Sequence, residues 1–407
     1  MGFLSLMEID VKTEASVKTP PMPMAGLPRR RWLAWGATAL VASSAAGRAL
    51  AANTKTDTKI SPHALRLAAA WEGAQDYQVG VLALNQGRLQ VTGALDVPTR
   101  AHGIWQEKSG SLLAVARRPG DWLLRWTPGG KALLWGWIET DRAFNGHAVA
   151  SLDGKTLYTT ETNLETGEGV IGLRDSASLE KIDEWLTHGM DPHELLLDSD
   201  GSLMVANGGI PALPETGRLK IHMHRMDASL VRLDAATGEL RGQWRLADQR
   251  LSLRHLAWGP APTAQRSGSR LLGVALQAEH DDPVAKADAP VLAIFDGQRL
   301  QSYAAGAGQR LAGYGGSIVW VDAGFAVSCP RANGVALWRA EGQWAGFSAL
   351  DEACSLAAVS APAANGRRSA RLWAGGRVAV LGPDGAGQAT VTFSQALRLD
   401  NHWMSLA

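Results

Sequence analysis

Five histidines occupy one recurring position in this sequence. Each stands at the start of a short apolar run that predicts a β-strand, and they are His102, His147, His193, His255 and His402. The same position recurs without histidine at Gly316 and Cys354, and successive openings lie 38 to 62 residues apart. Histidine is the commonest metal ligand in proteins, and imidazole suits Fe, Cu or Zn. The pattern therefore predicts that these side chains meet and can hold a transition metal.

The repeat length indicates the fold that positions these histidines. A period of about 40–50 residues with several short strands in each unit is typical of a β-propeller. We predict an all-β, seven-bladed propeller with WD40-like repeats, formed by residues 64–407 as a single domain. The 45 glycines suit many tight turns, and most of the 16 tryptophans are expected to pack between neighbouring blades.

The two ends of the propeller sequence together predict how the ring closes. Residues 64–71, 78–84 and 88–95 predict three strands that precede the first histidine, and residues 400–406 predict one strand that follows the last full repeat. The C-terminal strand and the three N-terminal strands make one complete blade. Closure of this kind removes the open sheet edges that would otherwise pair with other chains.

Further polar side chains are expected at the mouth of the channel where the histidines lie. In a propeller, the second strand of each blade ends at the mouth where the inner strand begins. We predict Glu161 and Glu279 as oxygen ligands that join the histidines. The other polar side chains predicted to line this funnel are Arg117, Arg118, Asn163, Asn207, His280 and Arg331. Gly316 and Cys354 argue against a symmetric site and favour His402, His102, His147 and His193.

Three alternatives to a metal-binding scaffold stay open. Repeat duplication can copy a histidine that only forms hydrogen bonds between blades. A hydrolase of the propeller-lactonase kind would use Ca²⁺ with a histidine base, and its ligands would be Glu161, Asn163, Asn207 and Glu279. A pure protein-interaction module needs no site at all. The sequence has no nucleophile elbow, P-loop, His-Glu-x-x-His or haem-attachment motif, which argues against an enzyme.

Composition and cysteine content exclude several other classes. The formal net charge is +1, so there is no electrostatic case for binding nucleic acid or an anionic membrane surface. Cys329 and Cys354 are too few for a multi-cysteine metal site, and they either pair or remain two buried thiols. His222 and His224, in the long insert 208–226, are either a weak metal pair or solvated side chains.

The N-terminus predicts export. Arg29 and Arg30 precede an apolar run over residues 32–46, which is shorter than the roughly 18–20 residues that span a bilayer. The paired arginines followed by an aromatic residue and leucine resemble a twin-arginine signal. We therefore predict an N-terminal extension and signal peptide over residues 1–52, a linker over 53–63 and a periplasmic mature protein without a membrane span.

Several motifs resemble a bacterial family, the domain of unknown function 1513 propellers. They are Asn-Gly-His-Ala at 145–148, Glu-Thr-Gly-Glu-Gly-Val-Ile-Gly at 165–172, Pro-His-Glu-Leu at 192–195, Val-Ala-Asn-Gly-Gly-Ile at 205–210, Gly-Tyr-Gly-Gly-Ser at 313–317 and Val-Ser-Cys-Pro-Arg at 327–331. The resemblance covers essentially the mature chain. It implies twin-arginine export and a role in periplasmic iron handling, with an imelysin-type iron-uptake protein as the expected partner.

Overall fold

The computed structural model describes residues 65–406, with gaps at 74–75, 212–219, 221, 261–268, 323, 363–367, 378, 384–387 and 395–396. The predicted extension, signal peptide and linker lie outside the described residues, and the predicted domain boundaries stay predictions. All described residues belong to one compact unit, Ser61–Ala407.

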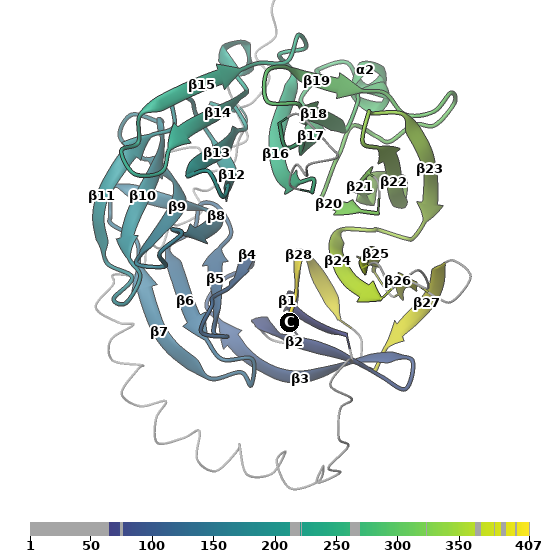
Figure 1. Ribbon diagram of the computed structural model, residues 1–407, viewed down its shortest axis with the longest axis horizontal. Coiled ribbons are helices and arrows are strands. Elements are labelled where there is room, and N and C mark those ends of the chain that lie inside the picture. The colour runs from purple at the N-terminus through teal and green to yellow at the C-terminus, as the bar shows by residue number, and fades with distance from the viewer. Residues whose placement is uncertain are drawn as a thin grey trace, which may run out of the picture. The chain divides into compact units, whose positions relative to one another are not determined.

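The fold is all-β, as predicted. In Figure 1 the sheets stand around a common centre. Helical structure in the described part of the chain is limited to the short segments η2 (Met223–Arg225), α2 (Pro283–Asp288) and η3 (Pro330–Ala332). No helix among the described residues has the length and apolar character needed to cross a membrane.

Five of the sheets have four strands each, in antiparallel order along the chain. The first contains β4 (Ala101–Gln106), β5 (Leu112–Ala116), β6 (Trp122–Trp126) and β7 (Ala132–Trp137). The second contains β8 (Arg142–Ala150), β9 (Thr156–Asn163), β10 (Gly169–Asp175) and β11 (Lys181–Leu186). The third contains β12 (Pro192–Leu197), β13 (Ser202–Asn207), β14 (Ser229–Asp234) and β15 (Leu240–Trp244). The fourth contains β16 (Leu251–Trp258), β17 (Leu272–Ala278), β18 (Leu292–Phe295) and β19 (Leu300–Tyr303). The fifth contains β20 (Ile318–Val321), β21 (Gly324–Cys329), β22 (Gly334–Arg339) and β23 (Trp344–Ala349).

The sixth sheet has eight strands and joins the two ends of the chain. Four of them are β24 (Ser355–Pro362), β25 (Arg368–Gly375), β26 (Ala379–Pro383) and β27 (Gln388–Phe393). The other four are β1 (Arg66–Glu72), β2 (Tyr77–Asn85), β3 (Arg88–Val97) and β28 (Arg398–Ser405). The C-terminal strand β28 pairs antiparallel with β1, as predicted, with Leu67 opposite Ser405 and Ala69 opposite Trp403. Within this sheet, the described residues of the two groups of four pair at two parallel positions between β27 and β3, Thr392 with Arg88 and Phe393 with Leu89.

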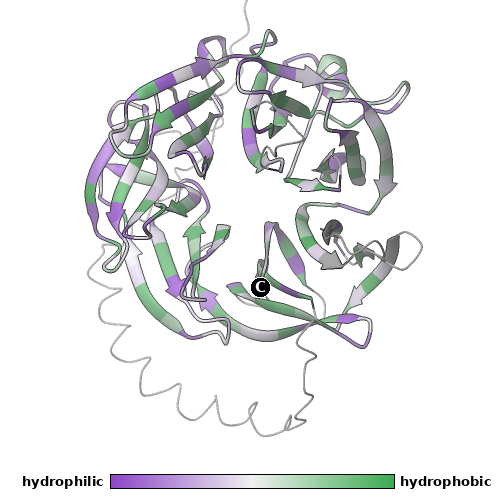
Figure 2. Cartoon of the chain, in the orientation of Figure 1, coloured by the Kyte–Doolittle hydropathy of each residue, from purple (hydrophilic) through white to green (hydrophobic). Residues whose placement is uncertain are grey.

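The core lies between neighbouring sheets. Trp122 and Trp126 on β6 are fully buried and pack in one cluster with Val79 and Val81 on β2, which belongs to the adjacent sheet. The expected packing of tryptophan between blades is present here. Middle strands are covered on both faces and therefore read as continuous apolar runs, as the green segments of Figure 2 show. The fourth strands form the outer edge, where Trp137 is 58% exposed.

Candidate functional site

The five repeated histidines meet at the centre of the ring of sheets. They come from five different innermost strands: His102 from β4, His147 from β8, His193 from β12, His255 from β16 and His402 from β28. The centroids of their rings lie 4.4 to 5.6 Å apart in nine of the ten pairs. The convergence predicted from the repeat is present, and we call these five residues the histidine cluster.

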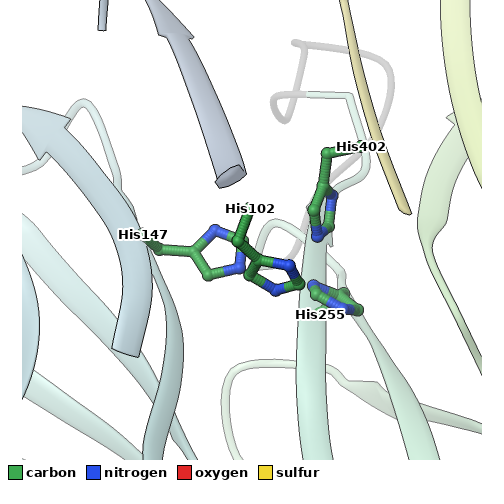
Figure 3. Close-up of side chains that lie close together, drawn as sticks. All are labelled: His102, His147, His255 and His402. Carbon is green, nitrogen blue, oxygen red and sulfur yellow. The ribbon is translucent and has the colours of Figure 1, made fainter. Parts of the chain in front are cut away.

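The nitrogen atoms of the cluster come close to the spacing of ligands on one ion. His193 Nε2 lies 3.3 Å from His102 Nε2 and 3.2 Å from His255 Nε2. Two nitrogens bound to one tetrahedral ion at about 2.0–2.1 Å would themselves lie roughly 3.3 Å apart. One ring nitrogen from each of His102, His147, His255 and His402 falls within 4.8 Å of the others. Figure 3 shows these four rings pointing toward one another.

This group of four differs from the subset favoured by the sequence, because it contains His255 in place of His193. Chain order places Gly316 and Cys354 between His255 and His402, which suggested that these two histidines were separated. Across the narrow centre, however, the rings of His255 and His402 are only 4.4 Å apart.

Backbone irregularities direct the histidines into the centre. On four inner strands the pairing register shifts at the histidine: between Ala101 and Ile104, Phe144 and Ala148, Pro192 and Leu195, and Leu253 and Leu256. Such bulges re-aim side chains and are frequent beside functional sites. Gly146 shows how close the backbones come, since its φ is +106° and a Cβ there would lie 2.6 Å from His102 Cδ2.

Glu194 is a part of the site that sequence reasoning missed. Its Oε2 accepts from Leu256 N at 2.8 Å and lies 3.2 Å from His255 Nδ1, and its Oε1 lies 3.6 Å from His147 Nδ1. A carboxylate that holds the Nδ1 side of an imidazole and leaves Nε2 free is the usual outer partner of a metal-binding histidine. Strand alternation would turn Glu194 away from its neighbour His193, but the bulge at this point brings both to the cluster.

Burial keeps the cluster neutral. His102, His147, His193 and His255 are 2–6% exposed. Desolvation lowers the pKa of all five histidines well below 6.5, and that of His255 to about 3. The positive charge of Arg117 lowers the pKa of His102, His255 and His402 further. The neutral imidazoles have the lone pairs that a metal ion requires.

Hydrogen bonding within the protein does not satisfy these rings. His102 Nδ1, His147 Nε2, His193 Nδ1 and His402 Nε2 have no hydrogen-bond partner among the described residues. With Glu194 ionised, His255 carries its proton on Nδ1, so its Nε2 is an acceptor. His193 Nε2 lies within hydrogen-bond distance of both His255 Nε2 and His102 Nε2, but a ring nitrogen has only one proton or one lone pair and so cannot satisfy both. A cation bound by the deprotonated Nε2 atoms of these three rings would satisfy all three lone pairs together.

The buried neutral histidines predict acid sensitivity. Their pKa values are lower in the folded protein than the 6.5 of an unfolded chain, so the unfolded chain binds more protons below that pH. We expect the free energy of unfolding to be highest above pH 6.5 and to fall as the pH drops toward 3, by up to about 1 kcal/mol per pH unit for each histidine.

Urea denaturation of the metal-free protein at pH 7.5 and pH 4.5 measures this effect. A variant with His102, His193 and His255 replaced by glutamine should lose much of the difference between the two pH values. Equal pH dependence in the variant and the wild type would contradict the prediction.

The carboxylates predicted as ligands are engaged elsewhere. Glu161 is fully buried and accepts from Arg174 Nη2 at 2.8 Å, while Lys181 Nζ lies 3.3 Å from its other oxygen. Glu279 accepts from Lys220 Nζ at 2.5 Å. Both carboxylates lie at the predicted strand ends, but each pairs with cations that the repeat pattern does not indicate. The structure therefore places neither of them in the histidine cluster.

The predicted funnel residues divide into two groups. Arg117, Arg118 and Arg331 line the cavity next to the histidines, as expected. Asn163 accepts from the backbone of a turn, Asn207 donates to Thr187 O at 2.9 Å, and His280 lies 3.0 Å from Asp248. The four-residue Ca²⁺ site of the hydrolase alternative is therefore not assembled, because its amides and carboxylates have other partners.

The thiols and the insert histidines add no ligands to the cluster. Cys329 and Cys354 are both free, and burial raises the pKa of Cys329 to about 12 and that of Cys354 to about 11. Both are therefore protonated and poor metal ligands at neutral pH. His222 and His224 are exposed, with ring centroids 5.9 Å apart.

The described residues define the protein as an all-β scaffold of the propeller type with a histidine-lined centre. The chain belongs to the family described as "Protein of unknown function (DUF1513)", whose model matches residues 95–406 and so includes all five histidines. No curated protein matches the sequence significantly.

Solved structures resemble the chain only distantly. A functionally unknown protein from Desulfotomaculum acetoxidans matches with a TM-score of 0.52 at 9% identity, over 84% of this chain and 98% of that one. Apo AztD from Citrobacter koseri matches with a TM-score of 0.48 at 11% identity, over 84% and 98%. Streptogramin B lyase matches with a TM-score of 0.48 at 11% identity, over 74% and 86%. At such identities the likeness concerns the fold alone.

Proposed function

We propose that this protein is a periplasmic, seven-bladed propeller that binds a transition-metal ion at its histidine cluster and serves metal uptake or handling. The observation that carries the proposal is the convergence of neutral imidazole rings on one point, with ring nitrogens of four of them left without a hydrogen-bond partner among the described residues. A chain that buries such atoms bears a desolvation cost which a bound cation would offset.

The blade count is supported by the way the inner strands contact one another. Contacts run in a closed cycle from β4 through β8, β12, β16, β20, β24 and β28 back to β4. The eight-stranded sheet contributes two of these inner strands and is joined at its middle by two residue pairs among the described residues. These contacts support counting it as two blades, the second of which contains the C-terminal strand β28.

The chemistry of the ligands narrows the choice of metal. The cluster offers imidazole nitrogen only, with Glu194 behind His147 and His255. Neutral nitrogen ligands without a thiolate suit Zn, Cu or Fe and are poor ligands for Ca²⁺ or Mg²⁺. When bound, the ion would supply Lewis-acid or redox character. The chain's own part is to fix the imidazole tautomers and keep the rings neutral.

The cellular setting is inferred from the N-terminus and the family. Arg29 and Arg30 match a twin-arginine signal, which supports export to the periplasm. The family resemblance supports a link to iron uptake, with an imelysin-type protein as the partner. A transition-metal site in an exported protein fits that setting.

Metal titration tests the proposed function directly. The purified mature protein, stripped with a chelator, should bind a single equivalent of Zn²⁺, Cu²⁺ or Fe²⁺ in calorimetry, with a matching metal content after desalting. Thermal unfolding should move to higher temperature in the presence of that metal. No saturable binding of any of the three ions would rule the proposal out.

A further inference from the structure

A cationic cavity of about 290 Å³ adjoins the histidine cluster on one side. His102, His193 and His255 form part of its wall. Six cationic side chains line the same cavity, namely Arg117, Arg118, Lys220, Arg254, Lys286 and Arg331. Among the described lining residues, Glu279 is the only carboxylate. The described lining therefore carries more positive than negative charge directly beside the place proposed for a cation.

Arg254 is built into this wall. It is 1% exposed, and its Nη1 donates to Asp191 at 3.0 Å. Asp191 is itself buried and also pairs with Arg118. The remaining Nε and Nη2 of Arg254 have no hydrogen-bond partner among the described residues. A guanidinium carries five N–H donors in a planar fork that matches the oxygens of a carboxylate or phosphate group.

Three further cations of the cavity, Lys220, Lys286 and Arg331, contact a single carboxylate and an aromatic ring among the described residues. Glu279 is shared by Lys220, at 2.5 Å, and Lys286, at 3.9 Å. Arg331 lies over the ring of Tyr314, with its Cζ 4.4 Å from the ring centre. Partial desolvation lowers the pKa of Lys220, although its side chain is still 43% exposed. A cleft lined mainly by charges of one sign concentrates ions of the opposite sign.

We propose that this cavity binds a small oxoanion with at least two negative charges, such as a polycarboxylate or phosphate, directly beside the histidine cluster. The site stands on the arginines and lysines alone. That the anion accompanies a metal ion rests on the proposed function. In that case the negative charge of the anion neutralises the cationic side chains that would otherwise repel the metal ion. The metal ion and the anion would then enter through this cavity together.

Calorimetry on the metal-free mature protein tests the anion site, with citrate and inorganic phosphate as separate probes. The variants Lys286→Gln and Arg331→Gln remove two accessible charges of the cavity and leave the buried Arg254–Asp191 pair intact. Each should weaken anion binding roughly 10-fold or more, the expected loss for one charge-assisted hydrogen bond. Arg241→Gln, an exposed arginine on β15 outside the cavity, is the matched control and should bind as the wild type does.

Tighter binding of citrate would identify a polycarboxylate, and tighter binding of phosphate would identify a phosphate group. The proposal is overturned if neither anion binds saturably, or if the two cavity variants bind as tightly as the control. Because no metal is present, failure here leaves the proposed function standing. Conversely, anion binding by a protein that takes up no metal would sink the proposed function and keep the anion site.

Discussion

Simultaneous replacement of His102, His193 and His255 by glutamine should reduce the affinity for the bound transition metal by about 100-fold or more, since loss of a supporting residue alone costs 10–100-fold. These three rings present the Nε2 atoms that lie 3.2 and 3.3 Å apart. Glutamine is close in volume to histidine, but it has an amide in place of the imidazole ring and so has no ring nitrogen to bind the metal. The variant is therefore expected to fold, and calorimetry with metal analysis measures the loss.

Two controls separate the cluster from surface histidines and from its supporting carboxylate. The variant His222→Gln/His224→Gln removes two exposed histidines and should bind metal as the wild type does. Glu194→Gln keeps the ligands but weakens the hold on His255 and His147, so an intermediate loss of about 10–100-fold is expected. Unchanged affinity in the triple variant would show that any metal binds elsewhere.

Deletion of β28, residues Arg398–Ser405, together with the last two residues should abolish cooperative folding. Without this strand β1 becomes an open edge, and the Arg100–Asp400 ion pair is lost. Trp403 is 8% exposed, and at about 25 cal/mol per Å² the burial of one tryptophan contributes roughly 5 kcal/mol. That loss approaches the whole stability of a typical domain, about 5–15 kcal/mol.

Circular dichroism during thermal unfolding and size-exclusion chromatography measure the effect of the deletion. The matched control is His402→Gln, which alters the cluster but keeps the strand, and it should remain folded and monodisperse. A truncated chain that unfolds at the same temperature as the wild type would show that β28 does not close the ring.

The sequence alone was sufficient to predict the strands, their repeat and the pairing of the C-terminal strand with the N-terminal strands. Alternating and continuous apolar runs end at glycine and aspartate turns, so local chemistry sets most strand boundaries. Because histidine recurs at one position of the repeat, the five histidines lie at the same level of their inner strands. Five such side chains therefore had to meet around a central axis, whatever fills the loops. The strand at 400–406 paired with β1 because each was otherwise an incomplete blade.

Only the tertiary structure decided which groups act together at the centre. Glu194 lies at the cluster because of a bulge that the repeat does not predict. Glu161 instead accepts a hydrogen bond from Arg174, 13 residues away on the next strand. Arg254 joins the cavity by pairing with Asp191, which directly precedes β12 of a different sheet. A strand's register is local, whereas the partner of a buried charge is set by whichever opposite charge folding brings within reach. The repeated histidines could be recognised in the sequence, but their neutral state and the cationic cavity beside them are visible only in the folded structure.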